Sequence, residues 1–331
     1  MELVCPAGNY LSLKMAVNGG ADAVYIGFND DTNARSFAGL NFNTDKITRA
    51  IDYAHQRNVK VFLAVNTYPQ PQGWDRWKCA IDRAAELKID TVIAADISIL
   101  EYASNQYPDL RLHLSVQGSA TNYEALRFYQ QNFGIQRAVL PRVLSLAQVK
   151  QVAEHSPVEL EVFAFGSLCI MAEGRCHLSS YVTGESPNMS GVCSPAKAVK
   201  WEMMDEVLES RLNDVLIDRY QKDEHAGYPT LCKGRFRVNQ QVVHALETPT
   251  SLNTLDLIPE LDAIGVKAVK IEGRQRSPAY VKEVTDIWRQ ALDHYSTAGD
   301  KFIPRSSWQE MLAKLSEGSQ TTLGAYSRPW Q

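Results

Sequence analysis

Residues 59–65, with the sequence VKVFLAV, form a short apolar run without strict alternation of apolar and polar residues. Such a run is typical of a strand buried on both faces, as in a parallel sheet. Similar runs occur at residues 23–28 (AVYIGF), 91–96 (TVIAAD), 137–141 (RAVLP) and 158–165 (VELEVFAF). Together they predict strands that begin near Leu3, Ala23, Val59, Thr91, Arg111, Gln136 and Val158.

Amphipathic segments separate these strands. We expect helices at residues 43–58, 73–87 and 145–154, and Ser145 with Gln148 has the spacing of a capping box. The alternation predicts an α/β protein with a (β/α)8, TIM-barrel-like fold. A doubly wound sheet would give a similar pattern, but no G-x-G-x-x-G sequence follows any strand, which weakens a dinucleotide-binding interpretation.

The expected eighth strand, GVKAVKIEG from Gly265, comes long after the seventh. We therefore predict a barrel domain at residues 1–295 with a cysteine-bearing insertion at about 167–264, and a C-terminal helical tail at 296–331. Within the insertion we expect a helix at residues 202–222 and an irregular segment at 248–254. Pro278 is expected to open the last long helix, at 279–295.

The composition sets limits on function. The chain has 331 residues, of which 45% are hydrophobic, and a net charge of -4, which disfavours a uniform basic surface for nucleic acid. No apolar stretch is long enough to span a bilayer, and the first twenty residues lack the features of a signal peptide. We therefore expect a cytoplasmic protein with reduced thiols.

Four of the six cysteines fall in the insertion: Cys169, Cys176, Cys193 and Cys232. Loops that leave the carboxyl ends of barrel strands build active sites, and Cys169 follows such a strand. Four thiolates can bind an iron–sulfur cluster or a tetrahedral zinc ion, and the spacing does not decide between them. Four unrelated buried cysteines are the other interpretation, although Gly166, Gly174 and Gly191 would permit sharp turns around a ligand.

The two remaining cysteines suggest no metal. Cys79 falls on an expected amphipathic helix, so core packing is predicted. Cys5 ends the first strand; packing is favoured there too, with a place at the barrel mouth as the alternative.

Longer motifs resemble the collagenase-like peptidase family, whose catalytic type was never assigned. The resemblance rests on residues 161–169 (EVFAFGSLC) and 174–180 (GRCHLSS), and it extends to residues 6–9 (PAGN), 20–27 (GADAVYIG), 269–274 (VKIEGR) and 277–280 (SPAY). Within the family, the chain is most similar to the members of oxygen-independent ubiquinone biosynthesis.

This resemblance implies a barrel with a four-iron four-sulfur cluster held by Cys169, Cys176, Cys193 and Cys232. Many relatives have a cysteine in the segment that corresponds to residues 253–257, where this chain has NTLDL. The resemblance therefore assigns Cys232 as the fourth ligand in place of that cysteine. The resemblance also implies a heterodimer with the related protein UbiV that hydroxylates the aromatic ring of ubiquinone precursors. Prephenate, from which other members draw oxygen to hydroxylate RNA bases, and a lipid-carrier accessory protein are further implied partners.

Polar residues where strands meet their loops are candidates to face a substrate. They are Asn66, Asp96, Gln117, Arg142, Glu272 and Arg274. Of these, Arg142 and Arg274 can clamp a dicarboxylate such as prephenate, and Asp96 and Glu272 are further catalytic candidates. Turn capping or a salt bridge within the barrel explains Asp96 or Glu272 equally well. His177 either tunes the cluster through a hydrogen bond or is an exposed loop residue.

Three other functions stay open. The chain can be an RNA-base hydroxylating member of the family, although its acidic balance speaks mildly against nucleic acid as a partner. It can be a non-catalytic electron-transfer or scaffold subunit. It can be a peptidase, although it has neither H-E-x-x-H nor G-x-S-x-G, and a ligated thiolate is not free to attack.

Overall fold

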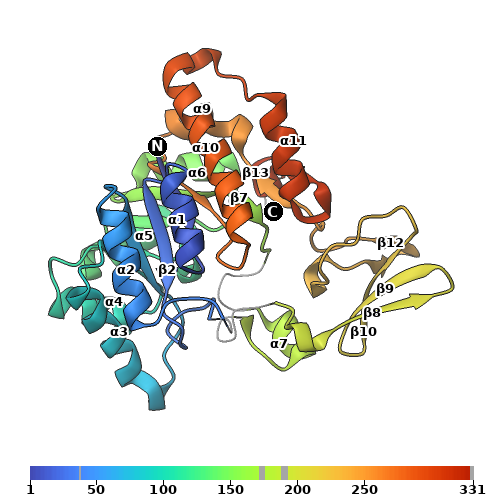
Figure 1. Ribbon diagram of the computed structural model, residues 1–331, viewed down its shortest axis with the longest axis horizontal. Coiled ribbons are helices and arrows are strands. Elements are labelled where there is room, and N and C mark those ends of the chain that lie inside the picture. The colour runs from blue at the N-terminus through green and yellow to red at the C-terminus, as the bar shows by residue number, and fades with distance from the viewer. Residues whose placement is uncertain (37–38, 171–175, 188–192, 329–331) are drawn as a thin grey trace.

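The computed structural model describes residues 1–36, 39–170, 176–187 and 193–328. Its centre is a closed barrel of eight parallel strands ringed by helices, as the sequence predicted (Figure 1). The barrel strands are β1 (Glu2–Pro6), β2 (Ala23–Gly27), β3 (Lys60–Val65), β4 (Thr91–Ala94), β5 (Leu112–Leu114), β6 (Arg137–Val139), β7 (Glu159–Ser167) and β14 (Ala268–Ile271). They follow one another in chain order, and β14 closes the ring by pairing with both β7 and β1.

Helices cover the outside of the barrel. They are α1 (Tyr10–Asn18), α2 (Thr44–His55), α3 (Trp74–Glu86), α4 (Ile97–Gln106), α5 (Tyr123–Phe133), α6 (Leu146–His155), α9 (Ile258–Ala263) and α10 (Pro278–Ala298), with α11 (Ser306–Leu315) beyond them. The expected capping box is present, because the hydroxyl of Ser145 accepts the Gln148 amide and the Gln148 side chain accepts the Ser145 amide. None of the helices in the described ranges is long and apolar enough to cross a membrane.

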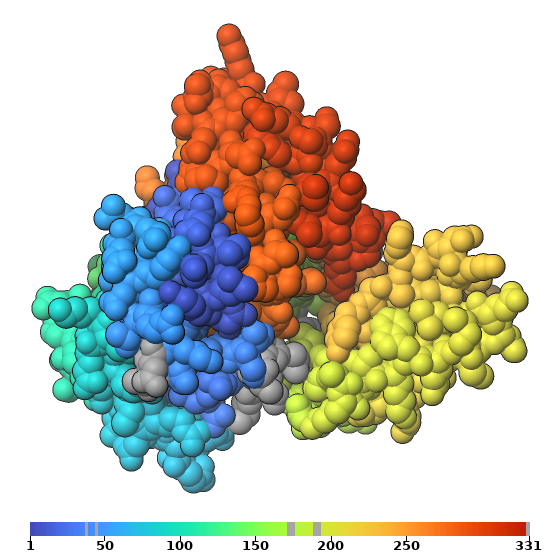
Figure 2. Space-filling model, viewed as in Figure 1, coloured from blue at the N-terminus to red at the C-terminus, as the bar shows by residue number. Residues whose placement is uncertain are grey.

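The insertion projects from the barrel as a separate lobe (Figure 2). It contains α7 (His177–Thr183), a three-stranded antiparallel sheet of β8 (Val199–Met204), β9 (Val207–Leu212) and β10 (Val215–Tyr220), and a hairpin of β11 (Phe236–Val238) and β12 (Gln241–Val243). The chain then returns through β13 (Ser251–Asn253), which pairs antiparallel with β7, and β15 (Thr321–Thr322) of the tail pairs with β13.

The expected helix at residues 202–222 is wrong. Its apolar residues do recur at helical spacing, but two-residue turns interrupt the segment. Asp205 and Glu206 both have positive φ, as a tight hairpin turn requires, and Asn213 with a φ of 50° lies in the second turn. These turns pair the flanking residues as strands, so local turn chemistry overrides the helical periodicity.

The main core lies between the barrel and its helices, and it contains one of the two remaining cysteines. Cys5 is buried there and accepts a hydrogen bond from Thr285 on α10 at 3.3 Å. The expectation that Cys79 packs in the core is wrong, because that residue is exposed. The buried stripe of α3 runs through Trp77, Ala80, Ile81 and Ala84, and Cys79 lies off this stripe.

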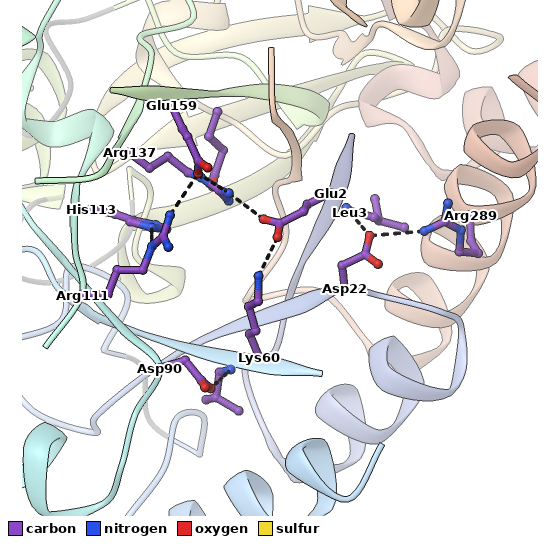
Figure 3. Close-up of polar contacts among 12 residues, drawn as sticks. Glu2, Leu3, Asp22, Lys60, Asp90, Arg111, His113, Arg137, Glu159 and Arg289 are labelled. Carbon is purple, nitrogen blue, oxygen red and sulfur yellow. Dashed lines mark hydrogen bonds and ion pairs between the residues drawn. The ribbon is translucent and has the colours of Figure 1, made fainter. Parts of the chain in front are cut away.

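Charged side chains fill the amino-terminal end of the barrel interior (Figure 3). Arg137 contacts three carboxylates: Glu2 at 2.6 Å, Glu159 at 2.7 Å and Glu161 at 3.4 Å. Glu161 is completely buried and also contacts Lys270 at 2.6 Å. Burial raises the pKa of Glu2, but hydrogen bonds from Lys60 and Arg137 outweigh it and lower the pKa overall. The network therefore joins strands from both ends of the barrel sequence across its interior.

Replacing Arg137 with methionine should lower the free energy of unfolding by about 3–5 kcal/mol, because it removes the buried cation that Glu161 shares with Glu2 and Glu159. Urea denaturation measures this difference. Arg127→Met is the matched control, since Arg127 pairs with Glu124 on the surface of α5 and should cost less than about 0.5 kcal/mol. Equal losses in the two variants would contradict a supporting role for the network.

Candidate functional site

The carboxyl ends of the barrel strands enclose a cavity of about 70 Å³. Its lining combines cations, one carboxylate, amides and the rings of Tyr25 and Phe163. Five of the six strand-end residues singled out from the sequence line it: Asn66, Gln117, Arg142, Glu272 and Arg274. The barrel thus brings together residues spread over most of the chain, as expected for the active-site end of this fold.

Asp96 is placed differently. Its side chain caps α4, where Oδ1 accepts the backbone amides of Ser98 at 2.9 Å and Ile99 at 3.4 Å. It does not line either of the cavities at this end of the barrel. The capping interpretation of Asp96 therefore fits the structure better than a catalytic one.

Arg274 is the most unusual group in the barrel cavity. Only 6% of the residue is exposed, and among the described residues Nη1 has no hydrogen-bond partner. Its guanidinium lies 5.6 Å from the centre of the Tyr25 ring. Burial lowers the pKa of Arg274 to about 10, so the group stays charged at neutral pH. A buried cation with an unused donor is suited to an anionic ligand.

Lys270 lines the same cavity and was missed in the sequence. Its Nζ lies 4.1 Å above the centre of the Tyr25 ring and contacts Glu161. Burial lowers its pKa, while Glu161 opposes that shift. The alternation of Ala268, Lys270 and Glu272 along the last strand was the available signal, since every second residue of a barrel strand faces inward.

Arg142 and Glu272 also connect the barrel to the insertion. Arg142 Nη1 donates to the backbone carbonyl of Ser167, and the Ser167 amide donates to Glu272 Oε2 at 3.4 Å. Gly166 beside it has a φ of 127°, and a Cβ there would lie 2.6 Å from the Cβ of Glu272. Two barrel side chains thus hold the residue from which the first cysteine segment departs.

A second cavity, of about 540 Å³, adjoins the first and shares four wall residues with it: Arg35, Gln117, Arg142 and Glu272. All four cysteines of the insertion line this second cavity: Cys169, Cys176, Cys193 and Cys232. Each is partly buried. Cysteines that are far apart in the chain therefore line one cavity at the barrel rim.

Different elements supply the four cysteines. Cys169 follows β7, Cys176 directly precedes α7, Cys193 lies between α7 and β8, and Cys232 lies in a short 3-10 helix, Leu231–Lys233. The Cys232 carbonyl accepts the amide of Glu247 at 3.0 Å. Of the glycines proposed to turn the chain around a ligand, Gly174 and Gly191 lie outside the described residues.

Burial dominates the electrostatics of two of these thiols, Cys193 and Cys232. Burial raises the pKa of Cys193, and the positive charge of Arg35 partly offsets that shift. Burial and the neighbouring cysteines together raise the pKa of Cys232 to about 12. In the metal-free chain Cys232 is therefore a protonated thiol at neutral pH. Its binding to a metal requires the release of that proton.

Within the described ranges, no three histidine, cysteine, aspartate or glutamate side chains form a group that could hold a single metal ion. In a four-iron cluster the cysteines bind different irons and surround the cofactor. His177 is exposed at the start of α7 and does not line the cysteine cavity, which agrees with its interpretation as a surface residue.

The C-terminal tail supplies one wall of the cysteine cavity. Lys233, next to Cys232, forms a buried ion pair with Glu317 of the tail. The amide of Glu317 donates to the Ser251 hydroxyl at 2.9 Å. Arg328 of the tail forms an ion pair with Glu247 at 3.2 Å. The tail therefore contacts Lys233, next to Cys232, and Glu247, whose amide binds the Cys232 carbonyl.

Comparison of the sequence with known proteins identifies a family that covers nearly the whole chain. The sequence model described as peptidase family U32 matches residues 8–329. A "tRNA hydroxylation protein P1" of Bacillus subtilis is 28% identical over 97% of this chain and 70% of its own length. An "uncharacterized protease" of Methanocaldococcus jannaschii is 33% identical over 88% of this chain and 65% of its own length.

A third relative, the "23S rRNA 5-hydroxycytidine C2501 synthase" of Escherichia coli, is 29% identical over 88% of this chain and 39% of its own length. The chain thus spans about two thirds of the length of the first two relatives and less of the third.

In the metal-free chain, iodoacetamide at pH 8 should modify Cys79 first, because it is exposed, and Cys5 and Cys232 last. Burial raises the pKa of each of these two thiols to about 12, so little thiolate is present, and their rates should rise as the pH increases towards that value. Mass spectrometry of the peptides over time measures the order. Equal rates for Cys79 and Cys232 in the folded chain would contradict the burial of Cys232.

Proposed function

Since the chain belongs to peptidase family U32, we propose that it is the iron–sulfur subunit of an oxygen-independent hydroxylase. The observation that carries this proposal is the convergence of Cys169, Cys176, Cys193 and Cys232 on one cavity that shares walls with the barrel mouth. Two relatives are named for hydroxylation of tRNA or of a 23S rRNA cytidine, which supports a hydroxylase role.

The finer part of the proposal follows the sequence motifs. It makes the chain a counterpart of UbiU, which acts with UbiV on the aromatic ring of ubiquinone precursors. Activity would then require the UbiV subunit, and a lipid-carrier accessory protein would present the long apolar precursor. Among the described residues that line the two cavities, only the cysteines lend support to the family's name as a peptidase. In this proposal they bind the cluster, so they are not free to attack a peptide bond.

A four-iron four-sulfur cluster fits the donor set. Four sulfur ligands are the number such a cluster uses, and thiolates favour iron–sulfur clusters and zinc over magnesium or calcium. Burial raises the pKa of Cys193, and the positive charges of Arg35, Lys233 and Arg142 oppose that shift. When bound, the cluster would supply one-electron transfer next to the barrel cavity.

The residues of the barrel cavity have separate tasks in this proposal. Arg142 and Arg274 bind the carboxylates of a co-substrate such as prephenate, with Arg274 contributing its unused Nη1 donor. Glu272 holds the Ser167 amide and so orients the first cysteine segment. Lys270 keeps a positive charge at the cavity wall, balanced by Glu161.

Hydroxylation of RNA bases is the second candidate. The names of the relatives favour it, whereas the net charge of -4 speaks mildly against it. Binding assays with total tRNA at 50 and 200 mM salt separate the two candidates. Tight binding that weakens steeply with salt would favour the RNA substrate over the ubiquinone precursor.

The chain co-purified with UbiV in the absence of oxygen should be brown, contain about four iron and four sulfide ions per cluster, and bleach on reduction. Cys176→Ala should lose most of this iron, because three protein thiolates hold the cluster less firmly. Iron and sulfide assays with visible spectra measure the effect. The same preparations should hydroxylate a ubiquinone precursor only with Cys176 intact.

Cys79→Ala is the matched control, since Cys79 is exposed on α3 and remote from the cavity. It should keep wild-type iron and activity. Full iron retention in Cys176→Ala would contradict the ligand set, and zinc without iron in the wild-type protein would contradict the cofactor.

A further inference from the structure

One arginine that the sequence did not single out lines both cavities. Arg35 lies in the segment between β2 and α2, and it is part of the wall of the barrel cavity and of the cysteine cavity. The residue is half-buried, and its Nη1 donates to the carbonyl of Ala34 at 3.1 Å. Arg35 therefore lies where the two cavities meet.

Three buried asparagines hold the backbone of Arg35 and of Ala34 before it. Asn33 Oδ1 accepts the Arg35 amide at 3.0 Å, and Asn41 Nδ2 donates to the Arg35 carbonyl at 2.7 Å. Asn66 Oδ1 accepts the amide of Ala34 at 3.1 Å. None of the three is more than 9% exposed. Both backbone polar groups of Arg35 are thus fixed by side-chain amides.

The asparagines also bind one another and the barrel. Asn33 Nδ2 donates to Asn41 Oδ1 at 3.0 Å and to the Phe28 carbonyl at 2.9 Å. Gly27 makes room for this arrangement, since a Cβ there would lie 2.3 Å from Asn33 Nδ2 and 2.6 Å from Arg274 Nη1. Buried polar networks that are satisfied in this way are rigid. The carbonyl oxygen of Asn66, a candidate to face a substrate, is used within the network.

The charge of Arg35 acts on its neighbour in the barrel cavity, where it adds to the effect of burial in lowering the pKa of Arg274. On its other side, Arg35 lines the same cavity as all four cysteines of the insertion. The two guanidinium groups repel each other, and the carboxylate of Glu272, which lines both cavities, offsets part of that repulsion. The network therefore holds a cation in a place where negative charge would be stabilised.

We propose that Arg35 sets the charge at the junction of the two cavities, and that Asn33, Asn41 and Asn66 are the positioning residues that keep it there. The inference rests on the proposed function. A cluster bound by four thiolates carries net negative charge, and a fixed cation beside it favours addition of an electron. In the barrel cavity the same cation strengthens binding of a carboxylate that reaches Arg274.

The first test is the midpoint potential of the cluster in the complex with UbiV. Arg35→Gln should shift the potential to more negative values with iron content unchanged, and Arg35→Lys should restore most of the wild-type value. Arg57→Gln is the control, because Arg57 packs on Tyr53 beyond the end of α2, and it does not line the cavities. A potential in Arg35→Gln equal to that of Arg57→Gln would overturn the proposal.

The asparagines are tested by a double-mutant cycle. Asn66→Ala should shift the potential in the same direction as Arg35→Gln, but it should add no shift when Arg35 is already glutamine. An equal shift by Asn66→Ala in both backgrounds would show that it acts without Arg35, and would overturn its positioning role.

A second measurement does not need the cluster. Calorimetric titration of malonate into the metal-free full chain should show about tenfold weaker binding to Arg35→Gln than to wild type, as expected for loss of one charge-assisted hydrogen bond. Unchanged or absent malonate binding would overturn the role of Arg35 in the barrel cavity. Absence of iron and sulfide from the wild-type complex would instead overturn the proposed function, so the two failures are distinguishable.

Discussion

The pairing of β14 with both β7 and β1 is the constraint on which the rest of the structure depends. It closes the parallel sheet into a barrel after the chain has left for the insertion and returned. Closure places Lys270 of β14 against Glu161 of β7 inside the barrel. Because neither charge could be buried alone at reasonable cost, the pair also favours this register over its neighbours.

Barrel closure also explains why two cavities lie side by side. The ends of β7 and β14 bring Ser167 next to Glu272. Arg142, in the loop after β6, donates a hydrogen bond to the carbonyl of Ser167. The first cysteine segment therefore starts at the edge of the barrel cavity. In the proposed function, a cluster bound by the cysteines would therefore lie close to a substrate in the barrel cavity.

Errors and omissions in the sequence interpretation have specific physical causes. The prediction of a helix at residues 202–222 was wrong because tight turns at Asp205–Glu206 and after Leu212 allow the segment to pair as antiparallel strands. Cys79 proved exposed because one helix buries only one stripe of its surface. Arg35 was missed because it belongs to a long irregular segment. Lys270 was missed because the interior of a barrel is usually expected to hold apolar layers, whereas this interior contains charged side chains.

By itself, the sequence determined the alternation of strands and helices that favoured a barrel, the position of most strands, the main helices and the strand ends that carry polar groups. These features follow from short-range patterns of burial and capping, which each segment carries locally. Only the tertiary structure decided that the four cysteines share one cavity, that Asp96 caps a helix, and that three asparagines fix Arg35 between two cavities. These facts depend on contacts between residues distant in the chain, and no local pattern encodes the distance between them.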